Sequence, residues 1–84
     1  MRQTTEAGEL FGQRVRDVRV ERGLTQRAMA ELADIPQTHL SSIERGFKLP
    51  NLLTVVRLAL VLDCKVSDLT SVFDKADLPS LLPK

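Results

Sequence analysis

The chain has 84 residues, of which 43% are hydrophobic and 4% aromatic, and its formal net charge at pH 7 is +1. A chain this short builds one small core, which predicts a single domain and leaves little material for an enclosed enzyme pocket. The lone cysteine, Cys64, excludes an internal disulfide and suits the cytoplasm. The N-terminus MRQTTEAGEL lacks the apolar core of a signal peptide, and the run VVRLALVL is too short to span a bilayer, so we expect a soluble protein without membrane association.

Positive charge is modestly concentrated in the first half of the chain. Between residues 10 and 48, seven Lys or Arg stand against five Asp or Glu, whereas residues 51–84 hold four of each. The near-neutral total argues against nucleic-acid binding, because strongly basic domains are its usual footprint. The local excess weakens that objection.

The first predicted helix is carried by apolar spacing. Phe11, Val15 and Val18 recur at the i, i+4, i+7 positions of one helical face, and Gly23 follows where a helix end favours positive φ. Arg14, Arg16 and Arg22 also fall on this helix. We interpret these arginines as a solvated face, with a phosphate clamp as the alternative.

The later helices are bounded by capping residues. Thr25 and Asn51 are good N-caps, Pro36 can open a helix but not continue one, and Gly46 stops the segment before it. We expect a compact all-α, five-helix domain over residues 9–73, between flexible segments at 1–8 and 74–84. The predicted helices cover about residues 9–22, 25–33, 37–45, 51–62 and 66–73.

The join between the second and third predicted helices is the most informative feature. Only DIP separates them, which forces the sharp crossing of a helix-turn-helix. At such a corner one position must be small and the turn must accept unusual φ, and Ala30 and Asp34 are those positions. Counted from Gln26, the fourth, eighth, tenth, fifteenth and eighteenth residues are all apolar: Met29, Ala33, Ile35, Leu40 and Ile43.

The stretch RGLTQRAMAELADIPQTHLSSIERG, continuing through PNLLTVVRLALVL into VSDL, resembles the DNA-binding domains of the Xre, lambdoid phage repressor and Cro family. The resemblance covers about residues 10–70. It implies that the third helix enters the major groove while the second crosses above it, against the backbone. Asp34 departs from the family pattern, where glycine is usual, and Pro36 replaces the usual Ser or Thr cap.

Candidate base-reading residues lie on the third predicted helix. They share short or flexible hydrogen-bonding side chains, expected on the face opposite Leu40 and Ile43: Gln37, Thr38, Ser41 and Ser42. Glutamine can pair with adenine through both amide groups, which makes Gln37 the strongest candidate. The alternative is that all four are ordinary surface residues.

Candidate phosphate-binding residues surround that helix. Gln26 lies in the first turn of the second helix, where free amides and the helix dipole favour an anion, and the resemblance implies that it binds a DNA phosphate. Further candidates are Thr25 beside it, and Arg45 and Lys48 at the end of the third helix. Phosphate contacts of this kind orient the protein on DNA but do not distinguish one base sequence from another. His39 is either a phosphate contact or a solvated side chain. With one histidine and no cysteine cluster, we expect no metal and no cofactor.

The resemblance also implies a structural ion pair. In the family, the arginine and glutamate that match Arg19 and Glu44 form a partly buried pair tying the first helix to the end of the third. We therefore expect these two residues to stabilise the fold rather than to touch DNA.

Excess apolar residues in the last two helices predict a homodimer. Leu53 and Leu60, at i and i+7, stand where relatives commonly have polar residues. With Leu69, Val72 and Phe73 they exceed what a small monomer needs to bury, which is typical of a partner surface. The alternative is that Leu53 and Leu60 pack under the C-terminal tail.

These features together predict a transcriptional regulator that binds double-stranded DNA as a homodimer on a pseudo-palindromic operator. A phage-type repressor, a restriction-modification controller and an antitoxin all remain open. The antitoxin would need a surface for a protein partner, which DKADLPSLLPK could supply by ordering on binding. The alternative from another class is a helix-turn-helix domain used for protein interaction, with DNA binding lost. An enzyme is disfavoured, because no nucleophile has a base nearby and no paired carboxylates suggest a cleft.

Overall fold

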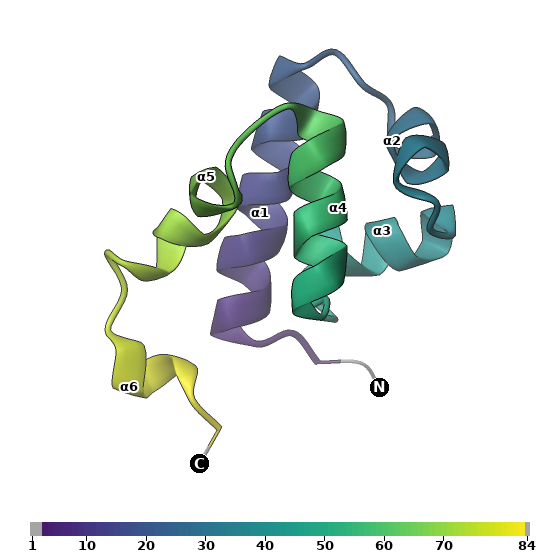
Figure 1. Ribbon diagram of the computed structural model, residues 1–84. Helices are drawn as coiled ribbons and strands as arrows, with labels where there is room; N and C mark the ends of the chain where they lie inside the picture. The colour runs from purple at the N-terminus through teal and green to yellow at the C-terminus, as the bar shows by residue number, and fades with distance from the viewer. Residues whose placement is uncertain (1–2, 84) are drawn as a thin grey trace.

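The computed structural model describes residues 3–83, which contain helices and turns and no strand. Figure 1 shows α4 standing in front of α1, with α2 and α3 on one side, α5 on the other and α6 set apart at the lower left. The elements are α1 (Glu6–Glu21), α2 (Gln26–Ala33), α3 (Gln37–Glu44), α4 (Leu52–Leu62), α5 (Val66–Thr70), the 3-10 helix η1 (Ser71–Phe73) and α6 (Leu78–Leu81). The expected all-α fold is confirmed.

A single apolar core draws on α1 to α5. Its fully buried large side chains are Phe11, Val15, Met29, Leu40, Ile43, Leu58, Leu62 and Leu69. The apolar spacing of the helix-turn-helix is thus used to attach α2 and α3 to α1 and α4. Leu69 is 0% exposed and packs in the core, which corrects its assignment to an exposed dimer surface.

The chain begins its first helix earlier than the apolar spacing predicts. α1 starts at Glu6, and the side-chain oxygen of Thr5 accepts a hydrogen bond of 3.0 Å from the Gly8 amide. Ala7 and Gly8 are buried, so residues 6–8 belong to the folded domain and not to a flexible segment. The buried residues of the first turn are small, so the sequence shows no repeat of large apolar residues there that would predict a helix.

The C-terminal part also differs from expectation. The predicted helix over 66–73 is divided at Thr70 into α5 and η1. The segment expected to be a structureless tail contains α6, a single turn with Pro79 near its start, where proline is tolerated.

A glycine lets α1 lie directly on the end of α3. A Cβ atom built at Gly12 would stand 2.2 Å from the carbonyl oxygen of Ile43 and 2.8 Å from that of Glu44. Real Cβ atoms do not approach carbonyl oxygens so closely, so only glycine permits this backbone contact. The position of α3 in the domain is therefore set by α1.

Arg14 of α1 and Arg22, the residue that follows α1, contact the backbone of the C-terminal half of the domain. Arg14 Nε donates to the Asp68 carbonyl at 2.7 Å, and Arg22 Nε donates to the Leu62 carbonyl at 2.7 Å, at the C-terminus of α4. A cation at a helix C-terminus also matches the negative end of the helix dipole. Arg14 and Arg22 thus bind the backbone and are not a simple solvated face, whereas Arg16 is exposed.

Candidate nucleic-acid interface

The corner between α2 and α3 is built on a left-handed aspartate. α2 ends at Ala33 and is followed by Asp34, which has φ 56° and ψ 46°, and the Ile35 amide donates to the Ala30 carbonyl at 3.0 Å. Aspartate accepts this conformation better than most residues with a Cβ. The predicted roles of Asp34 and of the small, buried Ala30 in the turn are confirmed.

α3 begins at Gln37, directly after Pro36, as predicted. Pro36 has φ −60° and its carbonyl accepts the amides of His39 and Leu40, but no side chain caps the helix start. Because Leu40 and Ile43 are fully buried, the inner face of this helix is fixed in the core. The outer face is held out as a rigid surface.

Three of the four candidate base-reading residues reach that surface. Gln37 and Thr38 are exposed and Ser41 is half-buried, whereas Ser42 is only 8% exposed. After α3 the chain turns back, and the Phe47 amide donates to the Ser42 carbonyl at 3.0 Å. Ser42 is buried and therefore does not share the open face, which corrects its placement.

The candidate phosphate-binding residues frame α3 on both sides. The Thr25 hydroxyl accepts from the Ala28 amide at 3.0 Å, which makes Thr25 the N-cap of α2. Arg45 and Lys48 are exposed beyond α3, and His39 is half-buried on it. The Arg45 guanidinium lies 4.9 Å from the centre of the Phe47 ring, a cation–π contact that restricts it.

A buried ion pair ties this site to α1, as expected. Arg19 Nε donates to Glu44 Oε2 at 2.7 Å and a second guanidinium nitrogen donates to Oε1 at 2.9 Å. The side chains are 12% and 2% exposed, and Arg19 also donates to the Leu24 carbonyl at 2.8 Å. Gln26 joins the pair by donating from Nε2 to Glu44 Oε1 at 3.1 Å, a contact that the sequence did not reveal.

The outer side of α4 carries an apolar strip, here called the α4 leucine surface: Leu52, Leu53, Val56 and Leu60. Leu53 is 75% exposed and Leu60 is 79% exposed, so the alternative that they pack under the C-terminal tail is wrong. Large exposed apolar patches on small proteins are typical of partner surfaces. Val72 and Phe73, the other two residues predicted to form the dimer surface, lie on η1 and are half-buried.

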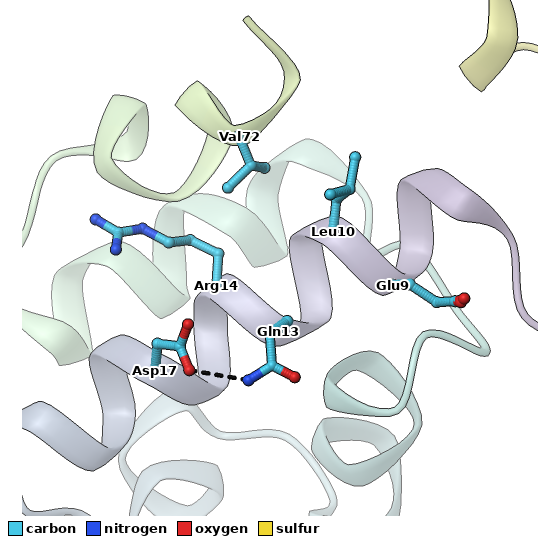
Figure 2. A pocket seen from close by; sticks show the side chains of 6 residues that line it. All are labelled: Glu9, Leu10, Gln13, Arg14, Asp17 and Val72. Carbon is cyan, nitrogen blue, oxygen red and sulfur yellow. Dashed lines mark hydrogen bonds between the residues drawn. The ribbon is translucent and has the colours of Figure 1, made fainter. Parts of the chain in front are cut away.

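The η1 residues are used mainly inside the domain. Phe73 stacks on Phe11, with ring centroids 6.4 Å apart and planes at 11°. Val72 lines a shallow pocket of about 400 Å³ whose other lining residues all come from α1: Glu9, Leu10, Gln13, Arg14 and Asp17. In Figure 2, Val72 projects towards α1 near Leu10 and Arg14, and the Gln13 amide bonds Asp17 at 2.9 Å.

A second hollow, of about 720 Å³, separates α6 from the body of the domain. Its lining is apolar and includes Ala7, Leu49, Phe73, Leu78, Leu81 and Leu82. Among residues 3–83, no ionisable side chain lines this second hollow. Burial raises the pKa of the Cys64 thiol, and the Asp68 carboxylate adds to that effect, which keeps the thiol protonated at neutral pH.

Two further features of residues 3–83 bear on the type of site. Across this range, no three His, Cys, Asp or Glu residues lie together in a way that could hold a metal ion. None of the helices described is long and apolar enough to cross a membrane.

Two helices that cross at a short turn, the second fixed by a core and a buried ion pair, define a helix-turn-helix domain. A helix-turn-helix family model matches residues 15–69, and the chain belongs to this family of transcriptional regulators. The resemblance to the Xre, lambdoid phage repressor and Cro family is thereby confirmed. Three similar proteins agree with this assignment.

The chain is 36% identical, over 67 residues, to the ImmF control region 10 kDa protein of Bacillus phage phi105, covering 77% of this chain and 74% of that protein. The restriction-modification controller protein C.AhdI from Aeromonas hydrophila matches with a TM-score of 0.72 and 32% identity, over 74% of this chain and 94% of that one. The biofilm regulator SinR, solved in complex with DNA, matches with a TM-score of 0.69 and 34% identity, over 71% and 97%.

Proposed function

We propose that this regulator binds double-stranded DNA sequence-specifically, with α3 in the major groove, and acts as a homodimer on a pseudo-palindromic operator. The observation that carries the proposal is the outer face of α3, where Gln37 and Thr38 are exposed while Leu40 and Ile43 lock the inner face. The structure of the similar SinR in complex with DNA supports it. Gln37, Thr38 and Ser41 are the proposed base readers.

Phosphate binding is assigned to residues on both sides of α3. Thr25 and Gln26 flank the start of α2, while Arg45 and Lys48 follow α3. These contacts fix the register of the protein on the duplex, because every sequence offers the same phosphates. His39, like Gln26, is half-buried, whereas the other proposed phosphate contacts are exposed.

The proposed dimer uses the α4 leucine surface. A formal net charge of +1 gives one copy little overall attraction to the phosphates, so we expect a single domain to bind DNA weakly. A two-fold interface is self-complementary, and a strip of exposed leucines satisfies that condition without charge pairing. Two copies would present their α3 helices to major grooves about 34 Å apart.

Selection of binding sites from a random DNA library tests the proposal directly. We expect a recovered consensus with two-fold symmetry, whose half-site spacing reports the separation of the two α3 helices. A library from which the protein enriches no consensus would contradict sequence-specific binding.

Replacing Gln37 by alanine is expected to weaken operator binding by about 1–3 kcal/mol and to relax the preference at one base position. The loss follows from removing a bidentate contact to one base edge. Binding to single-base operator variants, measured by fluorescence anisotropy, reports both effects.

Gln13→Ala is the matched control for that change, because Gln13 is an exposed glutamine of α1 that bonds Asp17. It should leave operator binding unchanged. Equal effects of the two substitutions would remove Gln37 from the reading face.

Replacing Leu53 by glutamate is expected to weaken dimerisation about 100-fold or more. The substitution occurs twice in a two-fold interface, and burying a leucine contributes about 1.5–3 kcal/mol. Sedimentation equilibrium at micromolar concentration measures the shift from dimer to monomer.

Leu82→Glu, at an exposed leucine of the C-terminal segment, serves as the control and should leave the dimer intact. A wild-type protein that is monomeric at micromolar concentration would count against the homodimer itself.

A second candidate function is favoured by the hollow beside α6. Leu78 and Leu82 are exposed apolar residues that line it, so the C-terminal segment offers a surface to a protein partner, as in the antitoxin alternative. Salt separates the two functions. DNA binding weakens steeply as salt rises, whereas an apolar protein contact does not.

A further inference from the structure

The buried ion pair also holds a residue that faces the proposed DNA backbone. Glu44 Oε1 accepts two hydrogen bonds, one from Arg19 and one from Gln26 Nε2 at 3.1 Å. Gln26 opens α2 and its side chain is half-buried, while the Glu44 side chain is 2% exposed. A glutamine in the first turn of α2 is thus fastened to a carboxylate at the end of α3.

This contact fixes which way the Gln26 amide points. A glutamine amide has two N–H donors and one carbonyl acceptor, and the one hydrogen bond that this amide makes within residues 3–83 uses a single donor. The second N–H therefore remains to donate to another acceptor. An amide held on one side presents that N–H in a fixed direction, so less freedom is lost when a ligand binds.

Arg19 makes the arrangement compatible with an anion nearby. An unpaired carboxylate beside a phosphate would repel it, but Glu44 accepts two hydrogen bonds from the Arg19 guanidinium. The pair presents no net charge, and Arg19 also donates to the Leu24 carbonyl. Glu44 can therefore orient Gln26 without opposing DNA.

We propose that Glu44, neutralised by Arg19, is a positioning residue that sets the Gln26 amide for a DNA phosphate. This inference rests on the proposed function, because it assumes that the protein binds DNA and that Gln26 contacts its backbone. Glu44 itself touches no DNA. Its effect on affinity passes through Gln26, in addition to its part in holding α1 on α3.

A double-mutant cycle separates positioning from stability. Arg19→Met and Glu44→Met together replace the buried pair by apolar side chains of similar length, which such sites tolerate much better than the loss of one partner. Affinity is measured for wild type, Q26A, R19M/E44M and the triple variant. The probes are the duplex enriched from the random library and a scrambled duplex of equal length.

Positioning predicts a strongly non-additive result. Q26A should weaken binding about tenfold in the wild-type background, equally on both duplexes because both offer phosphates. R19M/E44M should weaken binding about three- to tenfold, and Q26A should then add less than about a further twofold. A tenfold effect of Q26A in both backgrounds would overturn the inference and leave DNA binding standing.

A second measurement needs no DNA. In the free wild-type protein, the side-chain amide of Gln26 should show a high NMR order parameter, in contrast to that of the exposed Gln37. A Gln26 amide as mobile as that of Gln37 would overturn the inference. Failure of the wild-type protein to bind either duplex would instead contradict the proposed function, and the inference with it.

Discussion

Replacing Glu44 by alanine is expected to lower the free energy of unfolding by about 3–5 kcal/mol. The change removes the carboxylate that accepts two hydrogen bonds from Arg19, whose side chain is only 12% exposed in the intact domain. Removing one member of a buried ion pair costs far more than the pair contributes, because the other charge stays shielded from water. Urea unfolding followed by far-ultraviolet circular dichroism measures the loss, since the chain has no tryptophan or tyrosine.

An exposed ion pair of the same protein is the control. Arg27 and Glu31 lie 3.5 Å apart on α2, with both side chains open to solvent. Glu31→Ala should therefore cost less than about 0.5 kcal/mol. An unchanged unfolding midpoint in the Glu44→Ala variant would contradict the claim that the buried pair stabilises the fold.

Gly12→Ala is expected to destabilise the domain by about 3 kcal/mol or more, although alanine normally favours a helix interior over glycine by about 0.5–1 kcal/mol. The added methyl group would meet two backbone carbonyl oxygens of α3, at 2.2 and 2.8 Å. Backbone cannot rotate away as a side chain can, so α1 and α3 must separate. The same urea unfolding experiment gives the magnitude.

Gly23 offers the matched substitution. It has φ +71°, and nothing lies within 4 Å of the position that an alanine methyl group would occupy, so Gly23→Ala carries only backbone strain of about 1–2 kcal/mol. The difference between the two variants isolates the close approach of α1 to α3. A Gly12→Ala variant as stable as wild type would show that the two helices adjust without cost.

Much of the fold follows from local signals in the sequence. The apolar spacing and the caps Thr25 and Asn51 place the central helices to within a few residues, and Asp34 in the short turn predicts the left-handed corner. The start of α1 escapes this reasoning, because Ala7 and Gly8 are buried by close backbone packing and not by large side chains.

The candidate site is less accessible from the sequence. Exposure of Gln37 and Thr38 follows from the helical face that they share, but the same reasoning wrongly placed the buried Ser42 on that face. The Gln26 contact with Glu44 joins residues 18 positions apart and leaves no periodic trace. Long-range packing of this kind requires coordinates.

The contacts that α1 makes with α3 and α4 also bear on the spacing between the two half-sites that the proposed dimer would bind. Arg22 anchors α1 to the C-terminus of α4, while Gly12 seats α1 on α3. α4, which is proposed to form the dimer, and α3, which is proposed to contact the bases, are thus both held in place by α1. An extra base pair between the half-sites rotates the second major groove by about 34° around the DNA axis. Because α3 and α4 are both fixed to α1, we expect the proposed dimer to be unable to turn its second α3 into the rotated groove.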